Sequence, residues 1–241
     1  MIKSLSVILP LYNEEMRLKQ TFKKIISFIK KNKINFKEFV FVDDGSNDNS
    51  FKLINEFINK NRSFTKTSFK VIKLHKNIGK GGALKKGVRI CSCDWILTSD
   101  IDFSVSLFEL DNWLKKKYIE NSIKVYFGSR SHNKSLVKSK FYRKFVGILM
   151  RVLISFILGI KISDTQCGYK LYKKNIAKNL FSKLKFLGYE HDIEIVLLLK
   201  KQNIKIKELP VSWKHVDHSK VNIIQDSIKT FIKLFYIKLK Y

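Results

Sequence analysis

The first hundred residues alternate between short apolar runs and longer amphipathic segments, and this alternation restricts the possible folds more than any other feature. Strands are predicted at Leu5–Pro10, Glu38–Val42, Phe69–Leu74 and within Asp94–Asp102. Helices are predicted between them, at Glu14–Lys31, Asn49–Asn61 and from Ala83 to about Ile90. This strand–helix–strand order predicts an α/β protein with a doubly wound, mostly parallel sheet and helices on both faces.

Polar residues gather where the predicted strands end. The second strand runs into residues 43–48, which read Asp-Asp-Gly-Ser-Asn-Asp, and the third is followed by the glycine-rich residues 77–83. The fourth runs into Asp100 and Asp102. Because ligands of open α/β sheets bind outside the carboxyl ends of the strands, we expect a site at this edge.

Asp100 and Asp102 are spaced for convergence if the strand extends through them, since side chains at i and i+2 share a face. Two carboxylates so close repel each other unless a cation or a proton intervenes. Mg²⁺ usually takes one or two carboxylates together with substrate phosphate oxygens. The pair therefore predicts a divalent cation with a phosphorylated ligand, although taken alone it also fits a solvated turn.

The glycine-rich loop does not match two familiar nucleotide motifs. A dinucleotide fingerprint needs a third glycine where Leu84 stands, and a P-loop needs Ser or Thr where Gly81 stands. Gly79 and its neighbours still allow a phosphate to approach the backbone at a helix N-terminus, with Lys80 as a point charge.

The chain is strongly basic, with a formal net charge of +28, and its 45% hydrophobic content is ample for a core. Phosphorylated substrates, an anionic membrane surface and nucleic acid are the partners that such a charge favours. No basic stripe with interleaved aromatic residues is present, so we expect no nucleic-acid partner. Three cysteines without disulfide or zinc spacing, and no signal peptide, favour a cytoplasmic protein.

Motifs occur in an ordered set along nearly the whole chain, about residues 5–225. The first half carries Leu-Pro-Leu-Tyr-Asn-Glu at 9–14, Val-Asp-Asp-Gly-Ser-x-Asp at 42–48, Asn-x-Gly-Lys-Gly-Gly-Ala at 77–83 and Asp-x-Asp at 100–102. The second half carries Phe-Gly-Ser-Arg at 127–130, Asp-Thr-Gln-Cys-Gly-Tyr-Lys at 164–170, and Glu-Leu-Pro-Val-x-Trp at 208–213 followed by Ser219 and Lys220. The set resembles family 2 glycosyltransferases with the GT-A fold. The second half is similar to the dolichyl- or polyprenyl-phosphate hexosyltransferases, and most similar to their glucosyltransferase type.

The resemblance implies a nucleotide site at the ends of the first two strands. Pro10, Tyr12 and Glu14 match the family's loop around the nucleobase and ribose. Asp43 and Asp44 match its nucleotide-binding aspartates, one of which would bond to the base. UDP-glucose is the expected donor.

Asp100 and Asp102 match the family's metal-binding Asp-x-Asp, which bridges Mg²⁺ or Mn²⁺ to the diphosphate. Ser104 stands where mannosyl relatives often carry Gln, which favours glucose over mannose. Asp102 is therefore expected to be catalytic as well as metal-binding.

The acceptor implied by the resemblance is a polyprenyl or dolichyl phosphate, which is already anionic and needs positioning more than a strong base. Arg130 matches an arginine that meets this phosphate, with Arg143 and Lys220 as further candidates. In-line attack would invert the anomeric carbon. A soluble family 2 enzyme acting on a saccharide or another hydroxyl is the alternative, and it would need a base from Glu190–Glu194, such as Asp192. Those carboxylates also fit an ordinary acidic first helical turn.

Two further segments suit contact with an anionic membrane. Residues 141–160 are the most apolar stretch, but basic residues interrupt it, so it predicts either an interfacial helix or a core helix. We expect residues 1–220 to form the catalytic domain, with a basic amphipathic helix at 221–241 as an appendage that is either interfacial or packed on the domain. Its predicted apolar stripe comprises Ile224, Ile228, Phe231, Ile232, Phe235 and Leu239. A peripheral protein on the cytoplasmic face of the membrane is the resulting expectation.

Overall fold

The computed structural model describes residues 2–64, 66–138, 152–159, 161–216 and 223–241. Its strands are β1 (Ser4–Leu11), β2 (Phe36–Asp43), β3 (Thr67–Lys73), β4 (Trp95–Thr98), β5 (Val125–Ser129), β6 (Leu136–Lys138), β7 (Lys170–Lys173), β8 (Ile206–Pro210) and β9 (Ser212–Lys214). Its helices are α1 (Glu15–Lys31), α2 (Ser50–Lys60), α3 (Lys80–Ile90), α4 (Glu109–Lys115), α6 (Lys174–Lys183), α7 (His191–Lys201) and α8 (Ile223–Lys240). A further helical segment covers residues 152–158.

Seven of the strands form one sheet in the order β3-β2-β1-β4-β7-β5-β8. β3, β2, β1 and β4 are parallel neighbours, β7 runs antiparallel between β4 and β5, and β8 is parallel to β5. The prediction of a mostly parallel, doubly wound sheet is confirmed. β6 and β9 pair separately in a small parallel sheet.

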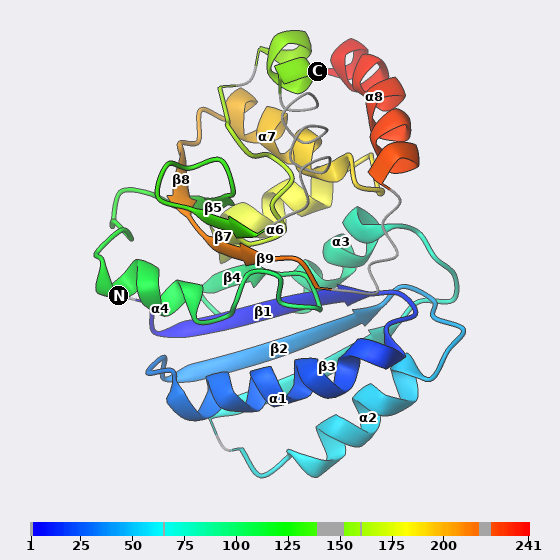
Figure 1. The fold of residues 1–241 in the computed structure, drawn as a ribbon, viewed down its shortest axis with the longest axis vertical. Helices are drawn as coiled ribbons and strands as arrows, with labels where there is room; N and C mark the ends of the chain where they lie inside the picture. The colour runs from blue at the N-terminus through cyan, green and yellow to red at the C-terminus, as the bar shows by residue number, and fades with distance from the viewer. Residues whose placement is uncertain (1, 65, 139–151, 160, 217–222) are drawn as a thin grey trace.

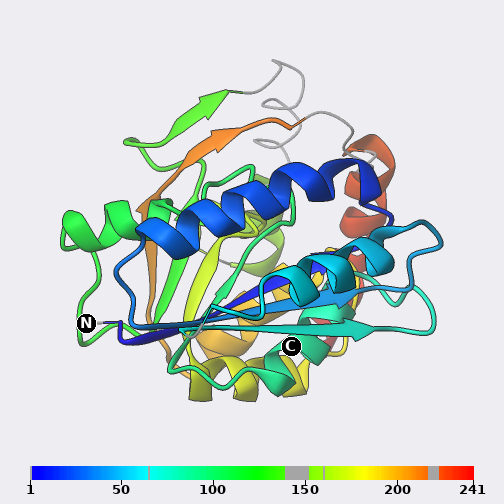
Figure 2. The ribbon, with the colours of Figure 1, turned by 90° about the horizontal axis from the view of Figure 1, so that it is seen from below.

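Helices cover both faces of the sheet and bury two apolar clusters (Figures 1 and 2). The first cluster contains Leu18 and Phe28 of α1, Ile54 of α2 and Trp113 of α4. The second contains buried residues of α3, α6, α7 and α8. The polar strand ends are left free at the carboxyl edge, where the sequence predicts the site.

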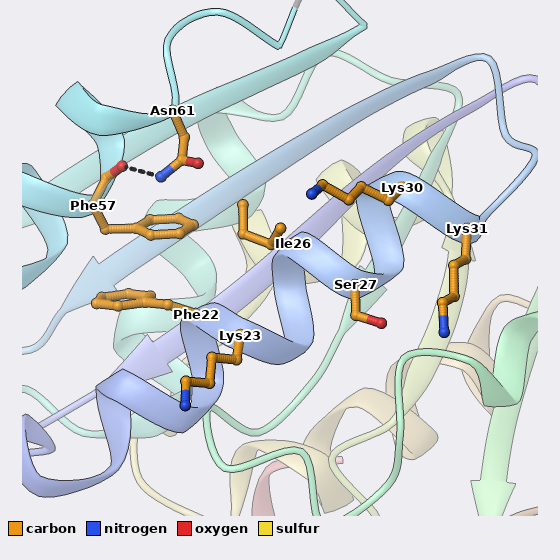
Figure 3. Close-up of a pocket in the computed structure, with 8 residues that line it drawn as sticks. All are labelled: Phe22, Lys23, Ile26, Ser27, Lys30, Lys31, Phe57 and Asn61. Atoms are coloured by element: carbon orange, nitrogen blue, oxygen red, sulfur yellow. Dashed lines mark hydrogen bonds between the residues drawn. The ribbon is translucent and has the colours of Figure 1, made fainter.

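A shallow groove of about 510 Å³ lies between α1 and α2, with the stacked rings of Phe22 and Phe57 in its wall (Figure 3). The ring centroids are 4.2 Å apart. Both helices start at the carboxyl edge of the sheet and run back along it. Because Lys30 and Asn61 lie at the C-terminal ends of these helices and line the groove, the groove extends toward the amino edge. It is therefore separate from the predicted site.

Two element boundaries differ from the predictions. β4 ends at Thr98, and a turn closed by the amide of Phe103 on the carbonyl of Asp100 carries the two aspartates. Tight turn geometry, and not the pleat of a strand, therefore directs their side chains. α3 begins at Lys80, so Gly81 is inside the helix, where a Cβ would lie 2.5 Å from the Cβ of His191. That glycine allows close helix packing.

The predicted amphipathic helix near the C-terminus is present as α8, and its described side chains show which of its faces packs on the domain. Leu234 and Ile237 are fully buried, whereas Ile232, Phe235 and Leu239 of the predicted stripe are 53%, 50% and 87% exposed. Leu234 and Ile237 belong to the second apolar cluster, and next to Leu234 the Lys233 ammonium pairs with Glu190 near α7 at 2.5 Å. These three residues of the predicted stripe therefore face away from the core, while the side chains of Ile224, Ile228 and Phe231 lie outside the described part of the structure.

Most of the apolar stretch 141–160 lies outside the described residues. Within its helical part, Ile154 is buried, while Val152 and Phe156 are 59% and 87% exposed. No helix in the described portion of the chain is both long enough and apolar enough to cross a membrane.

Candidate active site

The loops that follow β1 and β2 are joined by hydrogen bonds. The amide of Asn13, which has a φ of 54°, donates to Ser46 Oγ at 2.8 Å, and the amide of Glu14 donates to Ser50 Oγ at 2.8 Å. The predicted nucleotide loop, which carries Pro10, Tyr12 and Glu14, is thereby held beside the end of β2. This strand end carries the predicted aspartate pair Asp43 and Asp44.

That pair, Asp43 and Asp44, is buried, but its two members have different surroundings. Asp44 accepts from the amides of Ile78 and Gly79, both at 2.9 Å, and burial raises its pKa despite these bonds. Asp43 accepts from the amide of Ser46 through Oδ1, while its buried Oδ2 has no hydrogen-bond partner among the described residues. Asp44 thus fixes the glycine-rich loop, whereas Asp43 uses only one of its two carboxylate oxygens within the described structure.

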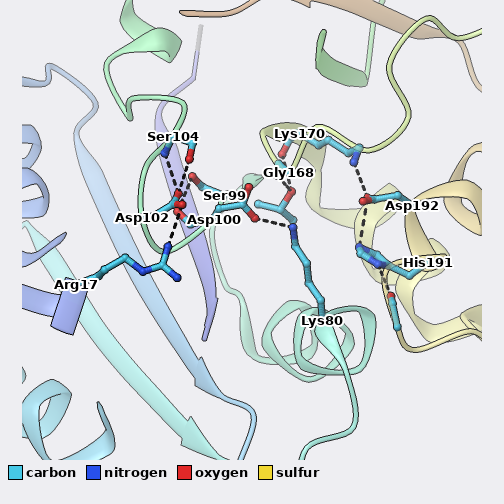
Figure 4. A network of polar contacts seen from close by, with 12 residues as sticks. Arg17, Lys80, Ser99, Asp100, Asp102, Ser104, Gly168, Lys170, His191 and Asp192 are labelled. Carbon is cyan, nitrogen blue, oxygen red and sulfur yellow. Dashed lines mark hydrogen bonds and ion pairs between the residues drawn. The ribbon is translucent and has the colours of Figure 1, made fainter. Parts of the chain in front are cut away.

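Lys80 and Asp100 form an ion pair at the centre of the edge, with Lys80 Nζ 2.5 Å from Asp100 Oδ1 (Figure 4). Asp100 keeps 43% of its side chain exposed. Loss of solvent would raise the pKa of Asp100, but the Lys80, Lys170 and Arg130 charges outweigh this and lower it. Burial would lower the pKa of Lys80, yet Asp100 and Asp192 raise it. Both groups are therefore charged.

Asp102 has other partners. Its Oδ1 accepts from the amide and hydroxyl of Ser104 at 2.8 and 2.9 Å, and its Oδ2 lies 3.2 Å from Arg17 Nη1. Arg17 also contacts Glu14, with Nε 2.6 Å from Oε2. The loop after β1 and the second aspartate are therefore joined through one arginine.

Gly168 packs directly against Asp100, because a Cβ built there would lie 2.6 to 2.8 Å from its carboxylate. Two residues further on, Lys170 is 1% exposed and its Nζ is 2.5 Å from Asp192 Oδ1. Asp192 also contacts His191 Nε2 at 3.2 Å. Burial would raise the pKa of Asp192, but His191, Lys170 and Lys80 lower it.

The predicted base region 190–194 is tied into the protein at each carboxylate. Glu190 pairs with Lys233, Asp192 with Lys170, and the fully buried Glu194 accepts from the amides of residues 185 and 186. Asp192, which is buried, ion-paired and has a lowered pKa, is a weak proton acceptor. This arrangement favours a structural role for the region.

Arg130 follows β5 and forms a bidentate pair with Asp164. Its Nε donates to Oδ2 at 2.8 Å and its Nη2 donates to Oδ1 at 2.9 Å. Its side chain is 30% exposed, whereas that of Asp164 is 1% exposed. Arg143 and Lys220, the other predicted acceptor residues, lie outside the described part of the chain.

The aspartates at 100 and 102 provide hard oxygen donors of the type that Mg²⁺ and Mn²⁺ prefer. Among the described residues, no group of three or more His, Cys, Asp or Glu side chains could hold an ion without other ligands. A cation here would need additional oxygen atoms, such as those of a diphosphate. The residues fit a metal that binds together with a phosphorylated ligand.

Comparison with known proteins decides the family. Residues 6–181 match the family described as glycosyl transferase family 2. The chain belongs to this family.

The glycosyltransferase has curated relatives across nearly its whole length. It is 32% identical to the dolichyl-phosphate beta-glucosyltransferase of Dictyostelium discoideum, over 98% of this chain and 74% of the relative. It is also 32% identical to the Saccharomyces cerevisiae protein of the same name, over 98% and 75%, and 29% identical to the human one, over 99% and 76%.

The fold of the glycosyltransferase matches that of solved enzymes. Glucosyl-3-phosphoglycerate synthase from Mycobacterium tuberculosis, solved with Mn²⁺ and UDP-glucose, superposes with a TM-score of 0.69 at 13% identity over 98% of this chain and 79% of that one. Its complex with UDP gives the same score at 14% identity, over 98% and 80%. The GT-A fold prediction is therefore confirmed.

The sequence alone assigned no role to several residues at the site of the glycosyltransferase. Arg17 had a usable signal, because it stands three residues after Glu14 at the start of a helix, where side chains meet. Asp164, Gly168 and Lys170 belong to one motif, but the distant residues that they contact cannot be read from it. The link from Asp164 to Arg130, 34 residues apart, appears only in the fold.

Proposed function

We propose that this glycosyltransferase moves glucose from UDP-glucose to a polyprenyl phosphate of the dolichyl phosphate class, with inversion at the anomeric carbon. The names of the full-length relatives support the sugar and the acceptor. Solved neighbours with bound UDP-glucose support the donor. The observation that carries the proposal is that Asp43, Lys80, Asp100 and Asp102 all lie at the carboxyl edge of the sheet, where Lys80 pairs with Asp100 and the charge of Arg130 also acts on Asp100.

The donor side of this proposal starts at Asp43. Its free, buried Oδ2 would accept from a nucleobase N–H, because a buried carboxylate oxygen is stabilised by a donor. Asp44 keeps the amides of residues 78 and 79 in place, so the start of α3 and Lys80 can face the diphosphate.

Asp100 and Asp102 would hold Mg²⁺ or Mn²⁺. When bound, the metal would act as a Lewis acid that neutralises charge developing on the diphosphate leaving group. Arg17 and Ser104 fix Asp102, and Gly168 leaves space for the Asp100 carboxylate. Lys80 is close enough to Asp100 to supply a second positive charge to the same diphosphate.

The acceptor side needs orientation more than proton removal, because a phosphate monoester is already anionic at neutral pH. Arg130 would bind that phosphate and aim its oxygen at the anomeric carbon. The pairing of Asp192 with Lys170 favours this over a hydroxyl acceptor, which would need a free base.

We further propose that the enzyme binds the cytoplasmic face of a membrane through α8 and the helical segment 152–158. Exposed apolar side chains on these two helices include Val152, Phe156, Ile232, Phe235, Tyr236 and Leu239. Both helices contribute buried residues to one apolar cluster, so they belong to the same part of the molecule. Exposed Lys238 and Lys240 on α8 would favour an anionic leaflet, by on the order of 1 kcal/mol each.

A transfer assay tests the proposal. Purified protein is incubated with UDP-glucose, UDP-galactose, UDP-N-acetylglucosamine or GDP-mannose, a short polyprenyl phosphate, and Mg²⁺ or Mn²⁺. The glucosylated lipid is extracted into an organic solvent and measured. The expected result is metal-dependent transfer of glucose to this lipid, with Asp102→Ala reducing the rate about a hundredfold or more. Glu120→Gln removes a surface ion pair with Lys207 and serves as a control with unchanged activity.

Transfer only to saccharides would discard the lipid acceptor and retain the nucleotide site. Preference for another nucleotide sugar would discard UDP-glucose. Metal-independent transfer would overturn the role of the aspartate pair.

A further inference from the structure

We propose that Asp164 and Glu208 are positioning residues that aim Arg130 at the acceptor phosphate. Asp164 would act directly on the guanidinium, and Glu208 would act through Asp164. The inference rests on the proposed function, in which Arg130 binds a phosphate, and it assigns roles to two residues that do not touch substrate.

Asp164 holds Arg130 at both its side chain and its backbone. Its carboxylate accepts from Arg130 Nε at 2.8 Å, from Nη2 at 2.9 Å and from the Arg130 amide at 2.9 Å. The Asp164 side chain is almost completely buried. A planar guanidinium held at two nitrogens by a fixed carboxylate cannot rotate about its long axis. Its orientation is therefore set before any ligand binds.

Glu208 on β8 fixes the segment that carries Asp164. It accepts from the amide of Ser163 at 3.0 Å, from the Ser163 hydroxyl at 2.6 Å and from the amide of Asp164 at 3.1 Å. Because β8 is parallel to β5, with Glu208 opposite Phe127, it comes from the strand next to the one that leads into Arg130. The arginine and its support are thus anchored to adjacent strands.

A third contact joins the same segments. Ser129 Oγ, at the end of β5, lies 3.0 Å from Ser163 Oγ. The strand end before Arg130 and the turn before Asp164 are therefore held together independently of the arginine–aspartate pair. This makes the geometry around Arg130 rigid on both sides.

The held guanidinium still has donors for a ligand. Of its five N–H groups, the pair with Asp164 uses one on Nε and one on Nη2, which leaves both on Nη1 and one on Nη2. The side chain is 30% exposed and lies in the electrostatic field of Asp100. It can therefore donate to a phosphate near the proposed reaction centre while Asp164 holds its other edge.

The arrangement favours arginine over lysine at position 130. Asp164 neutralises much of the guanidinium charge, so attraction by net charge is reduced and directed hydrogen bonds must supply the binding. A lysine at position 130 would keep the charge but lose the planar fork, so it could not pair with Asp164 through two parallel hydrogen bonds and present further donors to a phosphate in a fixed plane.

Asp164→Asn tests the direct role with little change in side-chain size. The amide presents a donor toward one guanidinium nitrogen and removes the charge, so Arg130 is no longer held. We expect the apparent KM for polyprenyl phosphate to rise roughly tenfold to a hundredfold. The Kd for UDP, measured by calorimetry, should stay within about twofold of the wild-type value. Glu208→Gln should shift the same KM in the same direction by a smaller factor.

A double-mutant cycle separates positioning from general damage. If Asp164 acts through Arg130, Asp164→Asn should add little to the defect of Arg130→Ala, because the two residues work as one unit. Glu120→Gln, which breaks an exposed pair with Lys207 beside Glu208 on β8, is the matched control and should leave the KM unchanged.

Three results would overturn the inference: an unchanged lipid KM in Asp164→Asn, an equal loss of UDP affinity, or additive effects with Arg130→Ala. These are distinct from failure of the proposed function, in which the wild-type protein itself would not transfer glucose to polyprenyl phosphate. A circular dichroism melt of each variant shows whether folding is retained, and the cycle is evaluated on folded variants.

Discussion

Neighbouring residues at the carboxyl edge have separate tasks. Asp43 and Asp44 look equivalent in sequence, but Asp44 accepts from the backbone of residues 78 and 79 through both oxygens, whereas one buried oxygen of Asp43 has no hydrogen-bond partner in the described part of the chain. Asp100 and Asp102 likewise face different cations, Lys80 and Arg17. Short motifs place these carboxylates at the edge, and backbone geometry then gives each one its partner.

Gly168 gives a residue-scale prediction. In Gly168→Ala the new Cβ would lie 2.6 Å from Asp100 Oδ2, so the carboxylate must move, and it can do so because it is 43% exposed. We expect thermal stability to stay close to wild type, while metal-dependent transfer falls roughly a hundredfold, since displacement of a catalytic group by about 1 Å has that effect. Melting temperature and initial rate check this. A variant that keeps full activity would show that the position of Asp100 is not critical.

At the scale of elements, α8 has two apolar faces, of which one is buried and the other is exposed. Leu234 and Ile237 reach the core, and Tyr241, just after the helix, donates to Glu194 at 2.5 Å. Ile232, Phe235 and Leu239 stay exposed. A helix that is apolar on both sides, packed on one of them, is suited to lie between a domain and a membrane surface.

The two faces of α8 predict opposite phenotypes. Phe235→Ser with Leu239→Ser should leave folding intact, because both side chains are half or more exposed, but should reduce flotation with anionic liposomes severalfold. Leu234→Ala on the buried face should lower the free energy of unfolding by about 2–5 kcal/mol with little effect on liposome binding of the folded fraction. Urea titration and flotation measure both properties. Full flotation of the double variant would exclude this surface as the membrane contact.

At the scale of the whole molecule, the chain has a net charge of +28, so the stability of its fold depends on the ionisation of its few carboxylates. Glu38, Asp164 and Asp192 are almost completely buried, and burial alone would raise their pKa values. Hydrogen bonds and cations, chiefly Lys70 for Glu38 and Arg130 for Asp164, lower these values instead. Each carboxylate is therefore ionised in the folded protein and stabilised in that form.

The sign of the resulting pH dependence follows from proton linkage. As the pH falls through about 4, carboxylates of the unfolded chain bind protons before the buried ones do, so the free energy of unfolding decreases. Loss of negative charge also increases self-repulsion of the basic chain. We expect the urea midpoint to fall steeply below about pH 5, and Asp164→Asn to make that fall shallower. A midpoint that is constant down to pH 3 would contradict the assignment.

Much of the fold class and the types of residue at the predicted site follow from the sequence alone. Apolar runs of strand length and amphipathic segments between them are enough to predict the parallel half of the sheet, because each must bury one face. The motifs at residues 10–14, 43–44, 79–80 and 100–102, through their resemblance to the family, predict a nucleotide-sugar site at the carboxyl edge. The family match confirms the glycosyltransferase assignment.

Tertiary structure decided which groups remain free to act, because pairings between distant segments depend on the fold. Antiparallel β7 brings Gly168 against Asp100, and Asp192, a base candidate by sequence, is paired with Lys170. Packing also decided which face of α8 is exposed, since helical periodicity identifies apolar stripes but cannot say which one meets the core. Sequence thus determined the kinds of residues at the edge, and the fold determined the partner of each.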